Sequence, residues 1–298
     1  MYNSKKLAGQ STGPGPVANG PGSLYIVATP IGNLEDVTLR AIKVLKEVHL
    51  IAAEDTRRTK KLLHACQIDT PLTSLFEHNE LKKSGAVIAK ILAGADVAYV
   101  SDAGTPGISD PGYLLIKEAL VHDINIISIP GACAAIAALS ISGLPTDSFV
   151  FHGFLPAKAG KRQHFIKSLA DETKTMIFYE SPNRLITTLR DLLAILGNRQ
   201  VAVSRELTKI YEETARGMLA QVIDAWCGRA LKGEITLVVA GKDKSDAPCS
   251  EGDIQELLRR YKESTELPER DLIEKIAQET GAPRKMVYRI VMKAKGRI

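Results

Sequence analysis

Short apolar runs alternate with amphipathic segments along most of the chain. Three such runs in the first half, Leu24–Ala28, His49–Ala53 and Val97–Val100, each have the length of one buried strand and end at residues typical of loops. Spaced apolar positions between them predict helices, the first capped by Asp36 or Thr38. Strands that alternate with helices imply a mainly parallel sheet with helices on both of its faces.

The same alternation resumes in the second half of the chain, after a segment containing Gly and Pro, 142–156, that we interpret as a hinge. The fold class that we expect is therefore α/β, with one α/β domain over residues 24–141 and another over 142–241. In such folds ligands bind at the carboxyl ends of the strands, where the loops gather. Further strands are expected at 124–129, 175–179, 200–204 and 235–240, and helices at 82–93, 113–121 and 184–196.

The two ends of the chain depart from this pattern. Residues 1–23 contain five Gly and three Pro and few apolar residues, which predicts a flexible tail. Residues 250–298 follow a polar linker and have a purely helical period. Ala277, Gly281 four positions later and Val287 six positions after that have the spacing of a helix-turn-helix.

The charge of the chain is concentrated at its C-terminus. The 298 residues carry 39 Lys and Arg against 34 Asp and Glu, a net charge of +5, within a composition ordinary for a globular protein. Six of the basic residues and no acidic residue lie in 282–298, so the remainder is nearly neutral. Such a helix could have a merely solvated basic face, but its position on a neutral body favours phosphate contact. The candidate phosphate ligands are Arg284, Lys285, Arg289 and Lys293.

Several classes of protein lose support from motifs that the sequence lacks. The four Cys are far apart without a C-x-x-C pair and the six His form no H-E-x-x-H, so we expect no metal site and a reducing, cytoplasmic location. No apolar run approaches the length of a membrane span, and the N-terminus lacks the apolar region of a signal peptide. The chain also has no P-loop, no G-x-G-x-x-G and no G-x-S-x-G motif.

The loop Asp102–Gly112 carries the strongest signal of a binding site. Its three Gly and two Pro make backbone N–H groups accessible, and Asp102 and Asp110 could accept hydrogen bonds from hydroxyl or amino groups. A purely structural turn is the alternative, but eleven irregular residues exceed what a crossover needs.

Charged clusters follow three other predicted strands: Glu54–Arg58, Glu180–Arg184 and the pair Arg205-Glu206. Each could be a self-satisfied group of salt bridges. Alternatively, the arginines could hold phosphates while a carboxylate orients a hydroxyl group.

Four of these motifs together resemble the tetrapyrrole-methylase superfamily: Thr29–Leu34, Ser101–Gly107, Ile129–Gly131 and Glu180–Arg184. Within it, they resemble the branch that methylates ribosomal RNA of the small subunit, and the resemblance extends over about 24–241 and the helical tail. It implies a dimeric enzyme with two α/β domains and S-adenosylmethionine in the cleft between them. It also implies 2′-O-ribose methylation of a cytidine in 16S rRNA, at the decoding centre of the small ribosomal subunit.

The resemblance and the charged loops together give a set of expected site residues. By position, the resemblance implies cofactor contacts at Ile31, Asp102, Gly104, Thr105, Cys133, Ala134, Tyr179 and Thr236. We hypothesise that Glu54 or Asp55 orients the ribose hydroxyl, with Glu180 and Glu206 as further candidates. RNA phosphates would be held by Arg57, Arg58, Arg184, Arg205 and the basic residues of the tail.

Two other functions stay open at this point. A methyltransferase acting on a tetrapyrrole or another small molecule would use the same cofactor cleft, but it would not explain the basic tail or the arginines of Asp55–Arg58. A non-enzymatic RNA-binding protein would explain the tail but not the loop Asp102–Gly112.

Overall fold

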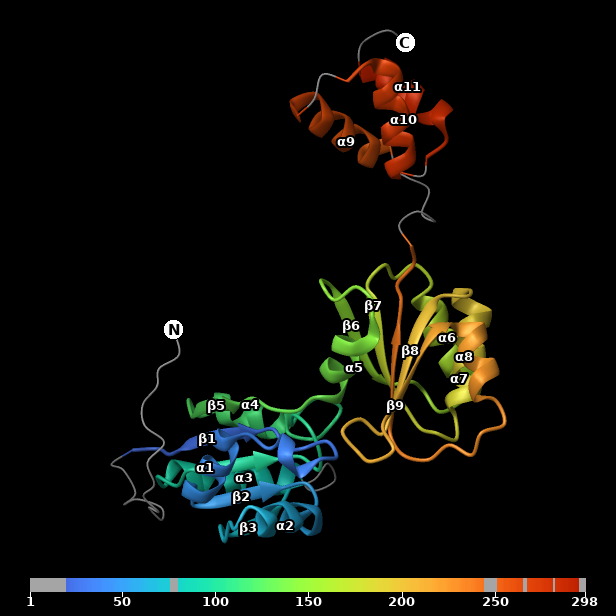
Figure 1. The fold of residues 1–298 in the computed structure, drawn as a ribbon. Coiled ribbons are helices and arrows are strands. Elements are labelled where there is room, and N and C mark those ends of the chain that lie inside the picture. The colour runs from blue at the N-terminus through green and yellow to red at the C-terminus, as the bar shows by residue number, and fades with distance from the viewer. Residues whose placement is uncertain (1–19, 76–79, 244–250, 265–266, 281, 295–298) are drawn as a thin grey trace.

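The computed structural model describes residues 20–75, 80–243, 251–264, 267–280 and 282–294. Two α/β domains lie side by side, and a group of three helices follows them at the C-terminal end (Figure 1). Residues 1–19 of the expected flexible tail lie outside the described residues, as does Gly281 of the expected helix-turn-helix. None of the described helices is both long and apolar enough to cross a membrane.

The first domain contains a five-stranded sheet in which every pairing is parallel, as the alternation of strands and helices predicts. Its strand order is β3-β2-β4-β1-β5. Thr38 caps the first α-helix, because its Oγ1 accepts a hydrogen bond from Ala41 N at 3.0 Å. The strands are β1 (Ser23–Val27), β2 (Leu50–Ala53), β3 (Leu72–Ser74), β4 (Val97–Val100) and β5 (Asn125–Ile129). The helices are η1 (Leu34–Asp36), α1 (Leu39–Glu47), α2 (Thr56–Ala65), α3 (Glu80–Leu92) and α4 (Tyr113–Val121).

The second domain contains a mixed sheet with the order β6-β7-β10-β8-β9. Only β6 and β7 are parallel, whereas β10 pairs antiparallel with β7 and β8, and β9 pairs antiparallel with β8. The segment 142–156, expected as a hinge, contains the edge strand β6. The strands are β6 (Phe149–Phe154), β7 (Thr175–Glu180), β8 (Gln200–Arg205), β9 (Glu213–Met218) and β10 (Ile235–Val239).

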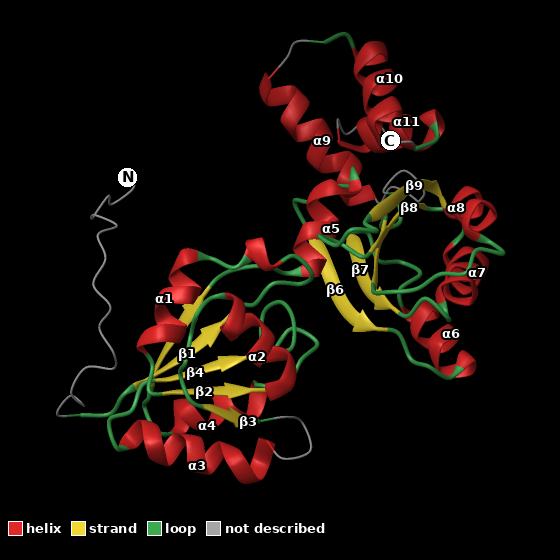
Figure 2. Ribbon diagram, turned by 60° about the horizontal axis from the view of Figure 1, so that its bottom comes forward, coloured by secondary structure: helices red, strands yellow, loops and turns green. Residues whose placement is uncertain are grey.

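Helices cover both faces of this second sheet (Figure 2). On one face, α6 (Ala159–Ser168), α7 (Leu185–Leu196) and α8 (Leu219–Trp226) share the largest apolar core with the strands. On the other face, α5 (Ala134–Ser142) packs against β7, β8 and β10. The sequence-based domain boundary at 141/142 lies at the end of α5, although α5 packs on the second sheet.

The C-terminal module consists of α9 (Glu251–Ser264), α10 (Glu269–Thr280) and α11 (Arg284–Ala294). These helices share a small apolar core that includes Leu272, Ile276, Val287 and Ile290. The helical period of the sequence therefore predicts α10 and α11 correctly, and α9 completes the core beside them.

Candidate functional site

Three loops at the carboxyl ends of the first sheet are joined to one another. Thr29, after β1, and Gly104, after β4, exchange two backbone hydrogen bonds of 2.9 and 3.0 Å. Thr105 Oγ1 donates to Ala132 O, after β5, at 3.1 Å. A Cβ atom on Gly131 would lie 3.0 Å from the Cβ of Ala28, so the first and third loops approach as closely as glycine allows. These contacts give the loops one fixed arrangement.

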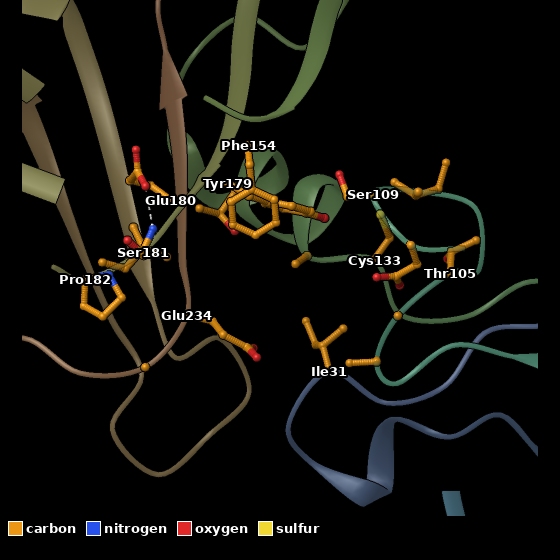
Figure 3. Close-up of a pocket in the computed structure, with 18 residues that line it drawn as sticks. Ile31, Thr105, Ser109, Cys133, Phe154, Tyr179, Glu180, Ser181, Pro182 and Glu234 are labelled. Carbon is orange, nitrogen blue, oxygen red and sulfur yellow. Dashed lines mark hydrogen bonds between the residues drawn. The ribbon is translucent and has the colours of Figure 1, made fainter. Parts of the chain in front are cut away.

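A cavity of about 300 Å³ lies between these loops and the second domain (Figure 3). This is the lower end of the size range of small-molecule sites in proteins. The first domain contributes Ile31 and the loop after β4, and the second contributes the ends of β6 and β7 and the start of β10. The lining residues are Ile31, Ala103, Gly104, Thr105, Ile108, Ser109, Asp110, Cys133, Ala134, Phe154, Tyr179, Glu180, Ser181, Pro182, Gly233, Glu234, Ile235 and Thr236.

The wall of this cavity combines apolar surface with negative charge. Asp110, Glu180 and Glu234 line it, and no Lys, Arg or His occurs among its described lining residues. Burial raises the pKa of Asp110, and the negative charges of Asp102 and Glu234 raise it further. Glu180 and Glu234 are each paired with a cation outside the lining, Arg184 and Lys209, so the preference of the cavity for a cationic ligand rests mainly on Asp110.

Tyr179 forms the aromatic side of the cavity. Its hydroxyl oxygen accepts a hydrogen bond from Ala135 N, in the first turn of α5, at 3.2 Å. Its ring contacts Phe151 and Phe154 edge to face, with centroids 5.0 and 5.6 Å away. Burial raises the pKa of Tyr179, so the phenol stays protonated. Thr236, its partner in the sheet register, is buried beside it.

Seven of the eight residues expected at the cofactor line this cavity together. They are Ile31, Gly104, Thr105, Cys133, Ala134, Tyr179 and Thr236. Asp102, the eighth, lines a neighbouring cavity instead. The lining residues Phe154 and Glu234 were not among the expected residues. Glu234 stands between Gly233 and a buried strand, and this was the only sequence signal that could have found it.

The neighbouring cavity, of about 230 Å³, is lined mainly by the first domain and has three basic and two acidic side chains. Arg58, Lys61 and Lys209 line it together with Asp102 and Glu234. Ile31, Ala103 and Glu234 line both cavities, so the two spaces adjoin at these residues. We call them the cofactor-side cavity and the basic cavity from here on.

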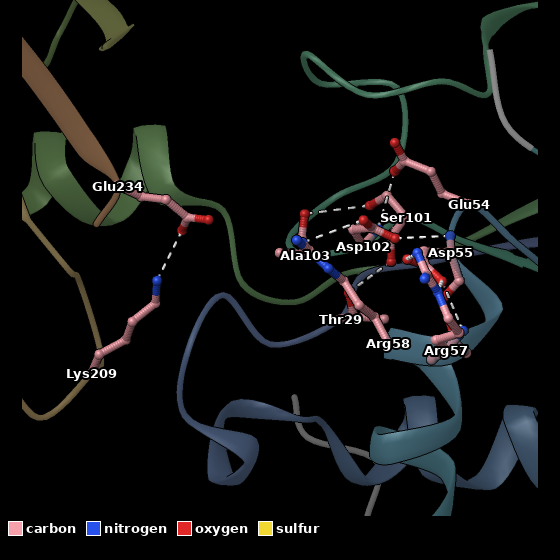
Figure 4. Close-up of polar contacts among 11 residues, drawn as sticks. Thr29, Glu54, Asp55, Arg57, Arg58, Ser101, Asp102, Ala103, Lys209 and Glu234 are labelled. Carbon is pink, nitrogen blue, oxygen red and sulfur yellow. Dashed lines mark hydrogen bonds and ion pairs between the residues drawn. The ribbon is translucent and has the colours of Figure 1, made fainter. Parts of the chain in front are cut away.

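Glu54, Asp55 and Asp102 form one network at the edge of the basic cavity (Figure 4). Glu54 Oε2 accepts from Asp102 N at 3.2 Å, and Asp102 Oδ1 accepts from Asp55 N at 2.9 Å. Arg58 Nη1 lies 3.3 Å from Asp102 Oδ2. Burial raises the pKa of Glu54, with smaller contributions from the charges of Asp102 and Asp110. The carboxylate of Asp102 therefore fixes the N-terminus of α2 through Asp55 N and the side chain of Arg58.

Asp55 is the N-cap of α2, and its carboxylate is committed to Arg57. Oδ1 accepts from Arg57 N at 2.8 Å, and Arg57 Nη2 lies 2.8 Å from Oδ2. The hydrogen bonds from Arg57 lower the pKa of Asp55 to about 2. A carboxylate with so low a pKa is a weak proton acceptor.

Glu180 and Arg184 are paired with each other inside the second domain. The Glu180 carboxylate accepts from Ser181 N and Thr188 Oγ1, both at 2.7 Å, and Arg184 Nη2 lies 2.6 Å away. Arg184 Nε donates to Ser181 Oγ at 3.2 Å. Both side chains therefore hold the start of α7, and a phosphate at Arg184 would have to compete with its ion pair to Glu180.

The other residues expected to hold RNA differ in how their charge is used. Arg205 Nε is 2.6 Å from Glu213 Oε1, so this arginine is satisfied within the sheet. Glu206 accepts from Lys209 Nζ at 2.8 Å. Arg57 and Arg58, by contrast, have largely exposed side chains. In the module, Lys285 and Lys293 are exposed, whereas Arg284 and Arg289 lie 3.7 and 3.4 Å from Glu274 and Glu251.

Within the described residues, no group of three His, Cys, Asp or Glu side chains is placed to hold a metal ion.

Two α/β domains with a cavity between them, at the loops of the first sheet, define the architecture of this protein. Residues 23–223 match the family described as tetrapyrrole (corrin/porphyrin) methylases, and the chain belongs to this family. A Synechocystis protein named ribosomal RNA small subunit methyltransferase I is 48% identical over 271 residues, which cover 90% of this chain and 97% of that protein.

Other relatives extend this comparison to chain length and to fold. A Thermotoga maritima protein with the same name is 46% identical over 222 residues, which cover 74% of this chain and all of that protein. Its length is close to that of the two α/β domains alone. A uroporphyrin-III C-methyltransferase from Thermus thermophilus, solved with S-adenosylhomocysteine, has the same fold, with a TM-score of 0.51, 17% identity and coverage of 74% of this chain and 98% of that one.

Proposed function

We propose that this protein is an S-adenosylmethionine-dependent methyltransferase that methylates the ribose 2′-hydroxyl of a cytidine in 16S rRNA. The names of its relatives and the family support an rRNA methyltransferase. The observation that carries the proposal is the pair of adjoining cavities, one acidic and apolar, the other basic. Methyl transfer to RNA needs a cationic cofactor and a polyanionic substrate to meet, and these two cavities suit one each.

The cofactor-side cavity fits S-adenosylmethionine in charge and shape. Its carboxylates favour a positively charged sulfur, and the apolar surface of Ile31 and Tyr179 suits a flat adenine ring. The glycine-rich loop brings the backbone of Gly104 and Thr105 to the wall, where amide groups can bind polar edges of the ligand. When bound, the cofactor supplies a methyl group that is already electrophilic.

The protein therefore has mainly to align the attacking oxygen with that methyl group. Ile31 and Ala103, at the border of the two cavities, set the passage through which the ribose must reach. Arg58 and Lys61 would bind the phosphates on the RNA side. The basic face of α11 would add phosphate contacts outside the body of the enzyme. RNA bases must be unstacked before a ribose inside the subunit can enter such a site.

We further propose that the assembled small ribosomal subunit is the substrate, that the enzyme works in the cytoplasm and that it is a homodimer. α5 supports a dimer, because it exposes two large apolar side chains on the face turned away from the second sheet. Its side chains Ala135, Ala138 and Leu139 are buried on the second sheet, whereas Ile136 and Ile141 are exposed.

A small-molecule methyltransferase is the second candidate, supported by the fold shared with a uroporphyrin-III methyltransferase. The basic cavity and the names of the closer relatives favour RNA over this candidate.

The test is to incubate the full-length protein with methyl-labelled cofactor and small subunits that lack the modification, and then to analyse the nucleosides. We expect label in 2′-O-methylcytidine. Label in another nucleoside would contradict the proposed position, and no transfer to RNA would contradict the function.

A matched pair of variants tests the cofactor site. Ala134 and Ala159 are both the first residue of a helix, but only Ala134 lines the cofactor-side cavity. Ala134→Leu should weaken S-adenosylmethionine binding at least about 10-fold by calorimetry, because the added side chain fills part of the cavity. Ala159→Leu should leave the affinity unchanged. Equal affinities for both variants would place the cofactor elsewhere.

A further inference from the structure

Glu234 occupies the border between the cofactor-side cavity and the basic cavity. It precedes β10, and its side chain extends into the space between the domains, toward Ile31 (Figure 3). Of the three residues that line both cavities, it alone carries a titratable group. The side chain is 71% exposed, so its carboxylate is accessible to a ligand in either space.

Lys209 holds this carboxylate from the second-domain side (Figure 4). Lys209 Nζ lies 3.2 Å from Glu234 Oε2 and 2.8 Å from Glu206 Oε1. Burial opposes the charge of Lys209, but the hydrogen bond to Glu206 and the charge of Glu234 outweigh it and raise the pKa of Lys209. The amine therefore stays a cation and is not itself a proton acceptor.

The backbone next to Lys209 has an unfavourable conformation at two residues. Glu206 and Thr208 have positive φ angles of 53° and 66°, which cost energy for residues with a side chain. Gly233 has a φ of +94°, which favours glycine, and a Cβ atom there would displace the Glu206 carboxylate. Glu206 Oε1 also accepts from Glu234 N at 3.1 Å. The strained loop thus fixes both Lys209 and the start of β10.

The same loop contacts the first domain. Thr208 Oγ1 accepts from Asn33 N, in the loop after β1, at 3.0 Å. The Lys209–Glu234 pair is thereby held opposite Ile31, in the passage between the cavities, rather than only within its own domain.

Three of the other acidic side chains near the passage are engaged by cations, whereas Asp110 lines only the cofactor-side cavity and Glu54 lines neither cavity. Asp55 is bound by Arg57, Glu180 by Arg184 and Thr188, and Asp102 by Arg58. Glu234 makes its ion pair through one carboxylate oxygen, Oε2, which leaves the geometry of Oε1 open to a hydroxyl donor.

We propose that Glu234 accepts the proton of the attacking ribose hydroxyl and that Lys209 is a positioning residue that holds the Glu234 carboxylate at the passage. This inference rests on the proposed function. In the step, a lone pair of the 2′-oxygen forms the new bond to carbon, and the carbon–sulfur bond breaks with its electrons going to sulfur. The hydroxyl proton passes to the Glu234 carboxylate and then to water.

The experiment compares full-length variants in single-turnover methylation of small subunits, with cofactor and RNA affinities measured separately. Glu234→Gln keeps the shape but cannot take the proton, so the rate at saturation should fall at least about 100-fold. Both affinities should stay within about threefold of wild type, and Glu234→Asp should restore part of the rate. Glu35→Gln, an exposed residue of η1 that lines neither cavity, is the matched control and should not change the rate.

Lys209 is tested by the separate effects of its replacement on kcat and KM. Lys209→Met should lower kcat about fivefold or more while KM and RNA affinity stay within about threefold of wild type, and Lys209→Arg should restore the rate. A Glu234→Gln variant with wild-type rate would overturn the inference, and so would one whose slow rate follows from lost cofactor binding. If the wild type itself methylates no RNA, the proposed function fails first.

Discussion

A substitution of Glu180, whose carboxylate is buried, distinguishes a structural role of this residue from a catalytic one. It accepts hydrogen bonds from Ser181 N and Thr188 Oγ1 and pairs with Arg184, whose side chain is 26% exposed. Glu180→Gln removes the charge and turns one acceptor into a donor that faces these donors. Loss of one partner of a buried ion pair costs about 3–5 kcal/mol, and the partial exposure of Arg184 favours the lower value, about 3 kcal/mol.

The single tryptophan gives a probe for this domain alone. Trp226 is buried in the same apolar core as Leu185 and Leu189 of α7, the helix that Glu180 and Arg184 hold. With a urea dependence of about 2 kcal/mol per M, a loss of about 3 kcal/mol lowers the fluorescence midpoint by about 1.5 M. Asp171→Asn, which removes an exposed ion pair with Lys242 in the same domain, should lower it by less than about 0.5 M.

Activity measured without urea decides what the change in stability means. We expect the folded Glu180→Gln protein to keep a turnover within a few-fold of wild type. An unchanged midpoint together with a large fall in kcat would refute this reasoning and would make Glu180 the proton acceptor again.

Two further predictions concern the basic helix α11 and the N-cap Asp55. Conversion of the basic residues of α11 to Gln in the full chain should reduce the slope of log affinity for RNA against log salt concentration by about 0.7 per lost phosphate contact. Lys117→Gln, in the first domain, is the control and should leave the slope unchanged. An equal slope for both variants would exclude α11 from RNA binding. The residues are Arg284, Lys285, Arg289 and Lys293. Asp55→Asn keeps a capping oxygen but loses the pairing with Arg57 that lowers the pKa of Asp55 to about 2. Above pH 4, the Asp55→Asn variant should therefore have a lower melting temperature than wild type by circular dichroism. This difference should disappear as the pH approaches 2, where Asp55 of the wild type becomes protonated. A difference that does not change with pH would contradict this cause.

The strands that the sequence predicts well are those buried on both sides. Val97–Val100 and Ile235–Val239 are entirely buried, and continuous apolar runs reveal them. Among the elements that the sequence did not predict, three show different reasons. The edge strand β9 is polar. The strand β6 contains His152 and Gly153 and lies in a segment rich in Gly and Pro, which is typical of a loop. The helix α5 has no polar face that would show a helical period. The antiparallel pairings of the second sheet depend on contacts between distant segments, which alternation alone does not specify.

The sequence predicted which loops form the candidate site, but not which charged side chains in them pair with one another. Gly and Pro at strand ends correctly indicated which loops gather. Arg57, Arg184 and Arg205 have equivalent sequence settings, each close to an acidic residue. In the structure their surroundings differ. Glu180 pairs with Arg184 and Glu213 pairs with Arg205 inside the second domain, whereas the side chain of Arg57 is exposed at the surface. Such pairing depends on side-chain direction and on distant residues such as Glu213, which no local pattern contains.

The route of the chain between the two domains has a mechanical consequence. β5 ends at Ile129 in the first sheet, and α5 begins at Ala134 on the second, so the crossing consists of four residues. Cys133 within this crossing lines the cofactor-side cavity, and Ala132 is fastened to Thr105. Any rotation of one domain against the other must therefore deform the cavity wall. By linkage, a ligand that fills the cavity would resist that rotation and hold the two domains more rigidly against each other.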